Sequence, residues 1–430
     1  MQSNQLTKGY NTHHVMEYIN KNFILLLDKV VLLFCIYAFY MEVWSHNYGL
    51  YGGFPPIYGI YFVFIYGICR LILWPDKFKS VSKLGFFWWL FFFVLLMTAN
   101  YIIVYFGLYH KYEDYLQGEF NKGLTALGFM LSIVILLVNR SNFQFVLKVL
   151  PFAVIAGCFI NFIDILDFSE KWGGLSLRGA GYYSNPNSSG RALSLGFIVT
   201  VFSVKKKYVL PYFLIYLFGT FCTLSRGSIP IIFLIGIYLI FIGSINLKGI
   251  LISFVSIVIV FFVLTSVVLN NDNLDLLVSR LQRNTQILNR VNTFVNPTGT
   301  KFQTGVRDDV ALDHFRFFAQ SPIVGHGMSS SRYAQKNFTK TNHSSHVMYI
   351  YMLNEYGLLG MLILLGLPLS LFYFEGHLVL QPELFFFAII FLISGLASHN
   401  LFDLRSLLFC YGLFAVYIMH AKDQEKTTIV

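Results

Sequence analysis

Long apolar segments recur along almost the whole chain, and they constrain its fold more than any other feature. Most of them cover about 18 to 25 residues, which is enough to cross a hydrocarbon core of roughly 30 Å as a helix. The composition agrees, because 56% of the residues are hydrophobic and only 12% are charged. The sequence therefore predicts an all-α polytopic membrane protein.

We count about twelve such segments. They fall at residues 23–43, 54–74, 84–106, 120–138, 146–166, 190–204, 208–224, 228–243, 248–269, 347–372, 383–399 and 404–420. The chain is then expected to have three parts: nine segments in residues 1–269, one large hydrophilic loop in residues 270–346, and three segments with a polar tail in residues 347–430.

The distribution of Lys and Arg predicts the orientation. With the N-terminus inside, the short cytoplasmic loops hold about twice as many basic residues as the short outer loops. Both termini are therefore expected in the cytoplasm, with the loop at 270–346 outside. The net charge of +10 includes this ordinary bias, while the basic residues outside favour an anionic partner.

The sequence predicts neither a cofactor nor a nucleic-acid partner. All five cysteines lie inside apolar segments, so no disulfide framework or thiolate metal site is indicated. The polar first 20 residues and the length of the first segment favour an uncleaved anchor over a signal peptide.

The large loop contains two helical patterns. In residues 274–291, leucines share one helical arc and three arginines share the next, as in a helix lying on the membrane surface, where lipid headgroups are the simplest partner. The stretch "VRDDVALDHFRFFAQSPIVGHG" predicts a second short helix, ended by Ser321-Pro322 and a glycine turn. Arg307 and Arg316 belong to this second helix.

Further arginines lie at other predicted outer ends. "LSLRGAGYYSNPNSSGRALSLG" contains Arg178, Asn187 and Arg191, and "TLSRGSIP" contains Arg226. Arginine keeps its charge and offers a fork of donors that suits phosphate or diphosphate. Each single arginine has the alternative of a structural ion pair, for which Asp164 and Asp167 are the available acidic residues.

Titratable and aromatic side chains also mark the start of the tenth apolar segment. "HSSHVMYIYMLNEYGLLG" contains His343, His346, Tyr349 and Glu355. His346 fits a catalytic base or an acceptor-positioning group, and a structural histidine is the plainer alternative.

A metal pair of His343 and His346 is a further alternative, but neither His314 nor His326 completes a convincing ligand set. Glu355 points to nearly the opposite side of the helix from His346, so it is expected to pack between helices. At the last outer turn, Arg405 is expected to pair with Asp403 or to join the same groove.

The order of these motifs resembles the O-antigen ligase and polymerase superfamily of bacterial envelope glycosyltransferases. The pieces are "RGAGYYSNPN", "SRGS", a long outer loop with Arg307 and "SPIVGHG", and His346 before "EYGLLG", over roughly residues 178 to 360. Where family members commonly have Asn after the histidine, this chain has Val347.

The resemblance implies a GT-C-like membrane glycosyltransferase of about twelve spans in the bacterial inner membrane, with its active site facing the periplasm. Its donor would be an undecaprenyl-diphosphate-linked oligosaccharide, its acceptor the hydroxyl of a glycan or of lipid A-core, and a chain-length regulator protein is a candidate partner. By motif, Arg178, Arg226 and Arg307 correspond to diphosphate-binding positions and His346 to the catalytic histidine.

The residue types suit this chemistry independently. A glycosyl diphosphate already carries an activated leaving group, so an enzyme must stabilise growing negative charge and remove a proton from the attacking hydroxyl. Arginines in a partly dehydrated groove do the first, and a histidine with a pKa near 6.5 does the second.

Three functions remain open. A polymerase of O-antigen or capsule repeat units is favoured by outer motifs rich in Ser, Asn and aromatic residues, and an O-antigen ligase would use the same donor chemistry. A lipid-linked oligosaccharide flippase would also have about twelve spans, but it has no need for a large translocated loop. An ion or drug transporter would need acidic pairs near the bilayer centre, whereas Asp28 and Asp164 lie near segment ends.

Overall fold

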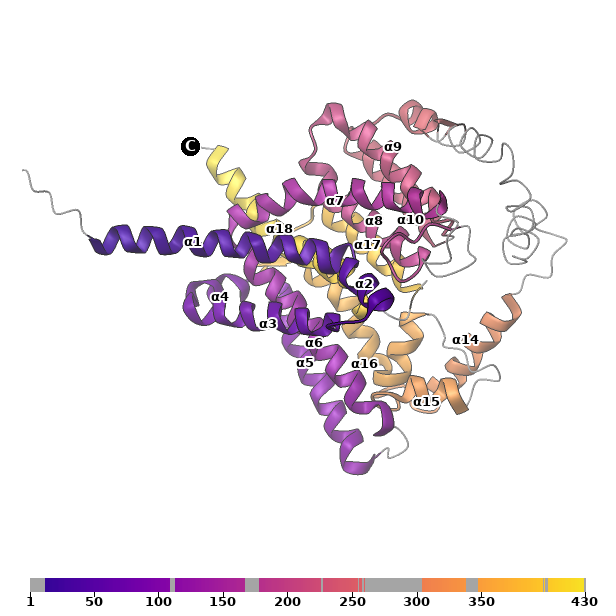
Figure 1. Cartoon of the computed structure of the whole chain (residues 1–430). Coiled ribbons are helices and arrows are strands. Elements are labelled where there is room, and N and C mark those ends of the chain that lie inside the picture. The colour runs from indigo at the N-terminus through magenta and orange to yellow at the C-terminus, as the bar shows by residue number, and fades with distance from the viewer. Residues whose placement is uncertain are drawn as a thin grey trace, which may run out of the picture.

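In the computed structural model, the described residues are 12–108, 113–166, 178–225, 227–253, 255–256, 259, 304–337, 347–396, 398 and 401–428 (Figure 1). The first helices are α1 (Thr12–Cys35), α2 (Val43–Tyr51), α3 (Pro56–Leu73), α4 (Pro75–Val81), α5 (Gly85–Ile103), α6 (Glu113–Leu137), α7 (Arg140–Leu166), α8 (Pro186–Thr200), α9 (Lys206–Cys222) and α10 (Ser228–Phe241).

After these come α14 (Thr304–Phe318), α15 (Ser330–Asn337), α16 (Met348–Ser370), α17 (Pro382–Leu396) and α18 (Arg405–Thr428). π-helical turns extend α1 (Ile36–Tyr40) and α5 (Val104–Leu108), and 3₁₀ turns lie at Val201–Ser203 and Leu401–Asp403. The strands β1 (Tyr373–Phe374) and β2 (His377–Leu378) form a small antiparallel hairpin between α16 and α17.

Six of these helical segments are long and apolar enough to cross a membrane: Asn22–Tyr40, Pro56–Leu73, Gly85–Gly107, Tyr115–Leu137, Arg140–Ile165 and Met348–Ser370. This confirms the prediction of a helical membrane protein with several spans. Every predicted segment except 248–269, most of which lies outside the described residues, coincides with a described helix.

The number twelve stays a prediction. Helices α8, α9, α10 and α17 have 15, 17, 14 and 15 residues, fewer than the roughly 20 that a perpendicular crossing needs. The predicted surface helix at 274–291 lies outside the described residues. The second helix of the loop is confirmed as α14, which ends where Ser321-Pro322 was expected to end it.

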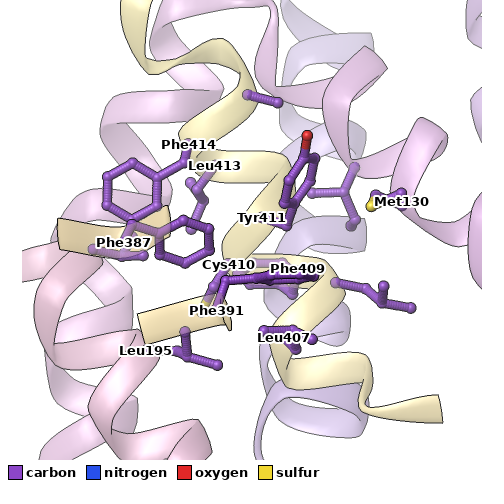
Figure 2. Packing of buried hydrophobic residues seen from close by; sticks show 14 of the residues in the cluster. Met130, Leu195, Phe387, Phe391, Leu407, Phe409, Cys410, Tyr411, Leu413 and Phe414 are labelled. Carbon is purple, nitrogen blue, oxygen red and sulfur yellow. The ribbon is translucent and has the colours of Figure 1, made fainter. Parts of the chain in front are cut away.

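Helix α18 lies at the centre of the bundle, in contact with α6 and α8. Its residues 407–411 are at most 1% exposed, so this stretch is covered on every side, as expected of a helix that is apolar all round. Figure 2 shows Phe387 and Phe391 of α17 on one side of it and Met130 of α6 on the other. The ring centroids of Phe387 and Phe414 are 4.3 Å apart.

Helix α8 is buried because its residues are small. The run from Ser188 to Thr200 is buried without interruption, and it is rich in Ser, Gly and Ala, which allow close helix packing. Its polar atoms are satisfied across helices: the Ser194 hydroxyl lies 2.8 Å from that of Tyr216, and the Tyr40 hydroxyl donates to the Ala192 carbonyl at 2.9 Å. Helix α8 is thereby fixed against its neighbours, which positions the arginine-bearing turn before it.

Candidate functional site

Helix α16 is interrupted at Gly357, and the loop after α14 occupies the interruption. Gly357 has φ 62° and ψ −149°, a conformation that only glycine adopts readily. The freed backbone groups pair with the loop: the amides of His326 and Gly327 donate to the carbonyls of Asn354 and Glu355 at 2.8 and 3.1 Å. Residues 322–328 are thus joined to the first half of α16 by backbone hydrogen bonds, as burial in a membrane protein requires.

Side chains reinforce this docking. The Asn100 side chain of α5 accepts a hydrogen bond from the Met328 amide at 2.6 Å. The His326 ring stacks on Phe317, with centroids 4.0 Å apart, and its Nε2 lies 2.6 Å from the Phe317 carbonyl oxygen. Burial lowers the pKa of His326, although the Phe317 carbonyl opposes this shift, so the ring is neutral at pH 7.

Beside this joint lies a cavity of roughly 590 Å³, between α5, α6, α14, α15, α16 and the turn Leu401–Asp403. Its lining is Phe93, Met97, Tyr115, Glu119, Lys122, Gly123, Leu127, His314, Met328, Ser331, Arg332, Gln335, Lys336, Met348, Tyr351, Met352, Glu355, Tyr356, Phe402 and Asp403. This volume is within the usual range of ligand pockets, about 300–1,000 Å³. The cavity combines charged groups with aromatic and methionine side chains.

An ion-pair network spans the cavity wall. Arg332 of α15 pairs with Glu119 of α6 at 2.7 Å, and the Lys122 ammonium lies 3.4 Å from the same carboxylate. The Tyr351 hydroxyl donates to the other Glu119 oxygen at 3.4 Å, and the Arg332 guanidinium lies 5.5 Å from the Tyr115 ring centre. Glu119 of α6 therefore joins α15 and α16, which lie far from α6 in the sequence.

Two further carboxyl groups line the cavity. Glu355 is 1% exposed and accepts a hydrogen bond from the Ser329 amide at 3.1 Å. Glu355 was expected to pack between helices; in the structure it lies at the cavity wall, next to Ser329. Burial raises the pKa of Asp403, and the charge of Glu119 raises it further, while Lys122 and Arg405 lower it.

The predicted arginine-rich turn forms a second polar region, before α8. Arg178 donates to the Thr223 carbonyl at 3.0 Å and to the Asn187 side chain at 2.9 Å. Asp164, an expected ion-pair partner of these arginines, accepts hydrogen bonds from the amides of Ala180 and Gly181 at 2.6 and 3.0 Å. Arg178 and Asn187 are therefore held together at the end of α9.

Arg191, one turn into α8, is almost fully buried. It donates to the Asn187 carbonyl at 3.2 Å, while its Nη1 atom has no hydrogen-bond partner within the described part of the chain. The carboxylate of Glu42 interacts electrostatically with both Arg191 and Arg405. The charge of Arg405 also lowers the pKa of Asp403 at the cavity wall.

Of the remaining predicted site residues, two have described side chains outside the cavity lining. Tyr349 faces α17, where its hydroxyl donates to the Leu392 carbonyl at 2.7 Å, and Arg316 lies on α14, 3.5 Å from Asp313 in an exposed i,i+3 pair. His343, His346 and Arg226 lie outside the described residues, as does the side chain of Arg307, whose backbone belongs to α14.

The metal alternative rests on His343 and His346 and is therefore not tested; within the described ranges, no group of three His, Cys, Asp or Glu residues could hold an ion. His314 Nδ1 lies 2.9 Å from the Asn354 side-chain nitrogen, and the His326 ring contacts the Phe317 backbone.

The sequence analysis missed Glu119, Lys122, Arg332 and Lys336. Glu119 and Lys122 stand at the start of an apolar segment, where charged residues are ordinary, and Arg332 and Lys336 stand in a loop with several other basic residues. Their one common signal is a position on the predicted outer side. Only the fold brings α6 and α15 together.

The fold and the cavity define a multi-pass helical membrane protein with a polar pocket at the start of α16. The sequence model of the O-antigen ligase family matches residues 211–365, which run from α9 through the large loop into α16. Over this part of the chain, the match supports the resemblance to the O-antigen ligase and polymerase superfamily, whose members are glycosyltransferase-like enzymes. No curated protein matches the chain.

Proposed function

We propose that the protein is a polymerase of O-antigen or capsule repeat units. It transfers a glycan from an undecaprenyl-diphosphate carrier to a hydroxyl of an acceptor glycan at the periplasmic face of the inner membrane. The observation that carries the proposal is the cavity at the start of α16, whose walls from α14, α15 and α16 belong to the region that matches the family. Met348 lines this cavity two residues after His346.

Three arginines are proposed to hold the donor diphosphate: Arg178, Arg226 and Arg307. Preorganised guanidinium groups in a partly dehydrated site stabilise the charge that develops on the leaving diphosphate. The hydrogen bonds of Arg178 to the Thr223 carbonyl and the Asn187 side chain support this role, because they fix its guanidinium beside the "SRGS" turn that contains Arg226.

His346 is proposed to remove the proton from the attacking acceptor hydroxyl. The new bond joins the acceptor oxygen to the anomeric carbon of the donor sugar, and the bond from that carbon to the diphosphate oxygen breaks. The diphosphate leaves on the carrier lipid, and the proton goes to the His346 imidazole.

An O-antigen ligase is the second candidate, because the matched family carries that description. It would use the same donor chemistry and deliver the glycan to lipid A-core. The two functions differ in the acceptor alone.

The experiment is transfer by purified protein in lipid nanodiscs, with undecaprenyl-diphosphate-linked repeat units and detection of longer lipid-linked products. His346→Ala should lower the rate about 100- to 10,000-fold, as expected for loss of a general base, and leave donor binding unchanged. The matched control is His377→Ala, which alters an exposed histidine of β2 and should have no effect. Normal transfer by His346→Ala would remove this residue from the mechanism.

The arginines are tested in the same assay. Arg226→Ala and Arg307→Ala should raise the KM for the donor, and Lys at either position should restore it only partly, because a single ammonium does not reproduce the guanidinium fork. Full restoration by Lys would contradict the bidentate role.

A further inference from the structure

The cavity beside α16 has balanced charge, which decides what kind of ligand suits it. Its acidic residues are Glu119, Glu355 and Asp403, and its basic residues are Lys122, Arg332 and Lys336. A diphosphate needs an excess of positive charge, whereas here the cations Arg332 and Lys122 both face the Glu119 carboxylate. The cavity therefore suits a ligand without net charge.

Arg332 in particular is already engaged. Its guanidinium is 2.7 Å from Glu119, and the same carboxylate accepts from Tyr351 and interacts with Lys122. The positive charge of Arg332, whose side chain is 43% exposed, is thus offset by the Glu119 carboxylate. The Glu119 side chain is only 14% exposed, so this carboxylate is held in place by its partners.

The rest of the wall suits the faces and hydroxyl groups of sugars. Aromatic side chains such as Tyr115, Tyr356 and Phe402 offer flat apolar surface, and Met97 and Met352 adapt to irregular shapes. Hydroxyl groups donate and accept at once, so they can pair with carboxylates and cations that lie next to each other. A neutral glycan suits this wall better than a lipid chain does, because a lipid chain would cover the exposed parts of Lys122 and Arg332 without offering them a hydrogen bond.

We propose that this cavity binds the acceptor glycan, with Glu119 as a residue that positions an acceptor sugar by accepting hydrogen bonds from its hydroxyl groups. The proposal rests on the proposed transferase function and separates the two substrates: the donor diphosphate at Arg178, Arg226 and Arg307, and the acceptor sugar between α6, α15 and α16. Arg332 and Tyr351 hold the Glu119 carboxylate in position.

The test measures binding of a neutral probe, the repeat-unit oligosaccharide of the host's own polysaccharide, freed of lipid and phosphate. It is titrated into the full-length protein in nanodiscs and followed by saturation-transfer NMR. Glu119→Gln keeps the shape and removes the charge, and it should weaken binding on the order of tenfold or more. Gln335→Trp, on the half-exposed rim, should obstruct the cavity and weaken binding at least as much.

The matched control is Glu375→Gln. Glu375 is also paired at 2.7 Å, with Lys83, but it belongs to the hairpin region outside the cavity lining, so binding should not change. Inorganic pyrophosphate should not displace the probe. Displacement by pyrophosphate, or unchanged binding in both Glu119→Gln and Gln335→Trp, would overturn the proposal.

Kinetics in the transfer assay separate this proposal from the proposed function. Glu119→Gln should raise the KM for the acceptor about tenfold and leave the KM for the donor unchanged; an altered donor KM with an unaltered acceptor KM would reject the acceptor site. If wild-type protein binds the oligosaccharide but transfers nothing, the proposed function fails while the glycan site stands.

Discussion

Charged residues inside this bundle are stabilised by specific partners. Asp28 of α1 is fully buried, and Arg70 of α3 donates to both of its oxygens at 2.7 Å. Tyr66 and Asn142 also donate to it, at 2.7 and 3.0 Å. Because an isolated charge at this depth is costly, the cluster fixes α1, α3 and α7 relative to one another.

Replacing only one residue of the Asp28–Arg70 pair should therefore lower the free energy of unfolding much more than replacing both. Arg70→Met leaves the Asp28 carboxylate buried without its main partner and should cost about 3–5 kcal/mol of unfolding free energy. The double variant Asp28→Leu with Arg70→Met should lose clearly less. Denaturation of the purified variants in mixed micelles measures their unfolding free energies. Equal losses in the single and the double variant would show that the unpaired Asp28 charge does not cause the loss.

A pH-dependent effect is expected at Asp403, because burial raises the pKa of its carboxyl group in the folded protein. Below the pKa of the unfolded chain, both states hold the proton and the residue has no net effect. As pH rises through the raised folded pKa, ionisation favours the unfolded chain and stability falls. Asp403→Asn should thus raise the melting temperature at pH 7, and this gain over the wild type should disappear near pH 4. A gain that stays constant from pH 4 to pH 7 would show that ionisation of Asp403 is not its cause.

At the scale of elements, the interrupted helix α16 organises the candidate site. The sequence predicts α14 and the glycine turn after it, because Pro and Gly are strong local signals. It does not predict the interruption at Gly357, since "YIYMLNEYGLLG" reads as one continuous apolar helix. The interruption depends on the distant loop 322–328, which supplies the missing backbone partners.

Gly357→Ala should disrupt this joint. A Cβ atom at this position would meet the Ile323 carbonyl and the Gly325 amide, and its φ of +62° is strained for any other residue. We expect transfer activity to fall at least tenfold, with the loop at 322–328 more accessible to protease. The control is Gly118→Ala in α6, where a Cβ would meet nothing within 4 Å. Normal activity of Gly357→Ala would show that the hydrogen-bonded contact between the loop at 322–328 and α16 is not needed for transfer.

At the scale of the whole molecule, hydropathy alone was enough to predict the long apolar helices and the membrane class. Apolar length is a local property, so it can be read segment by segment. The arrangement of the cavity is not local: Glu119 and Arg332 are 213 positions apart and meet only because α6 and α15 pack around α16. For the same reason, the sequence does not specify the contact of Tyr349 with α17 or that of Arg316 with Asp313.

The predicted topology is tested by single cysteines in a background in which Cys69, the exposed native cysteine, is replaced by Ala. Asn337→Cys on α15 should react with a membrane-impermeant maleimide in intact spheroplasts. His377→Cys, in the hairpin between α16 and α17, should react only after the membrane is opened. The reverse pattern would invert the topology and place the cavity in the cytoplasm.

The most direct test of the central claim is deletion of the gene in its native host, followed by gel display of the surface polysaccharide. A polymerase predicts core that carries a single repeat unit, because attachment continues without chain growth. Bare core, with long chains still on the carrier lipid, would instead identify the ligase. An unchanged ladder of long chains, or bare core with single units left on the cytoplasmic face, would contradict glycan transfer by this protein.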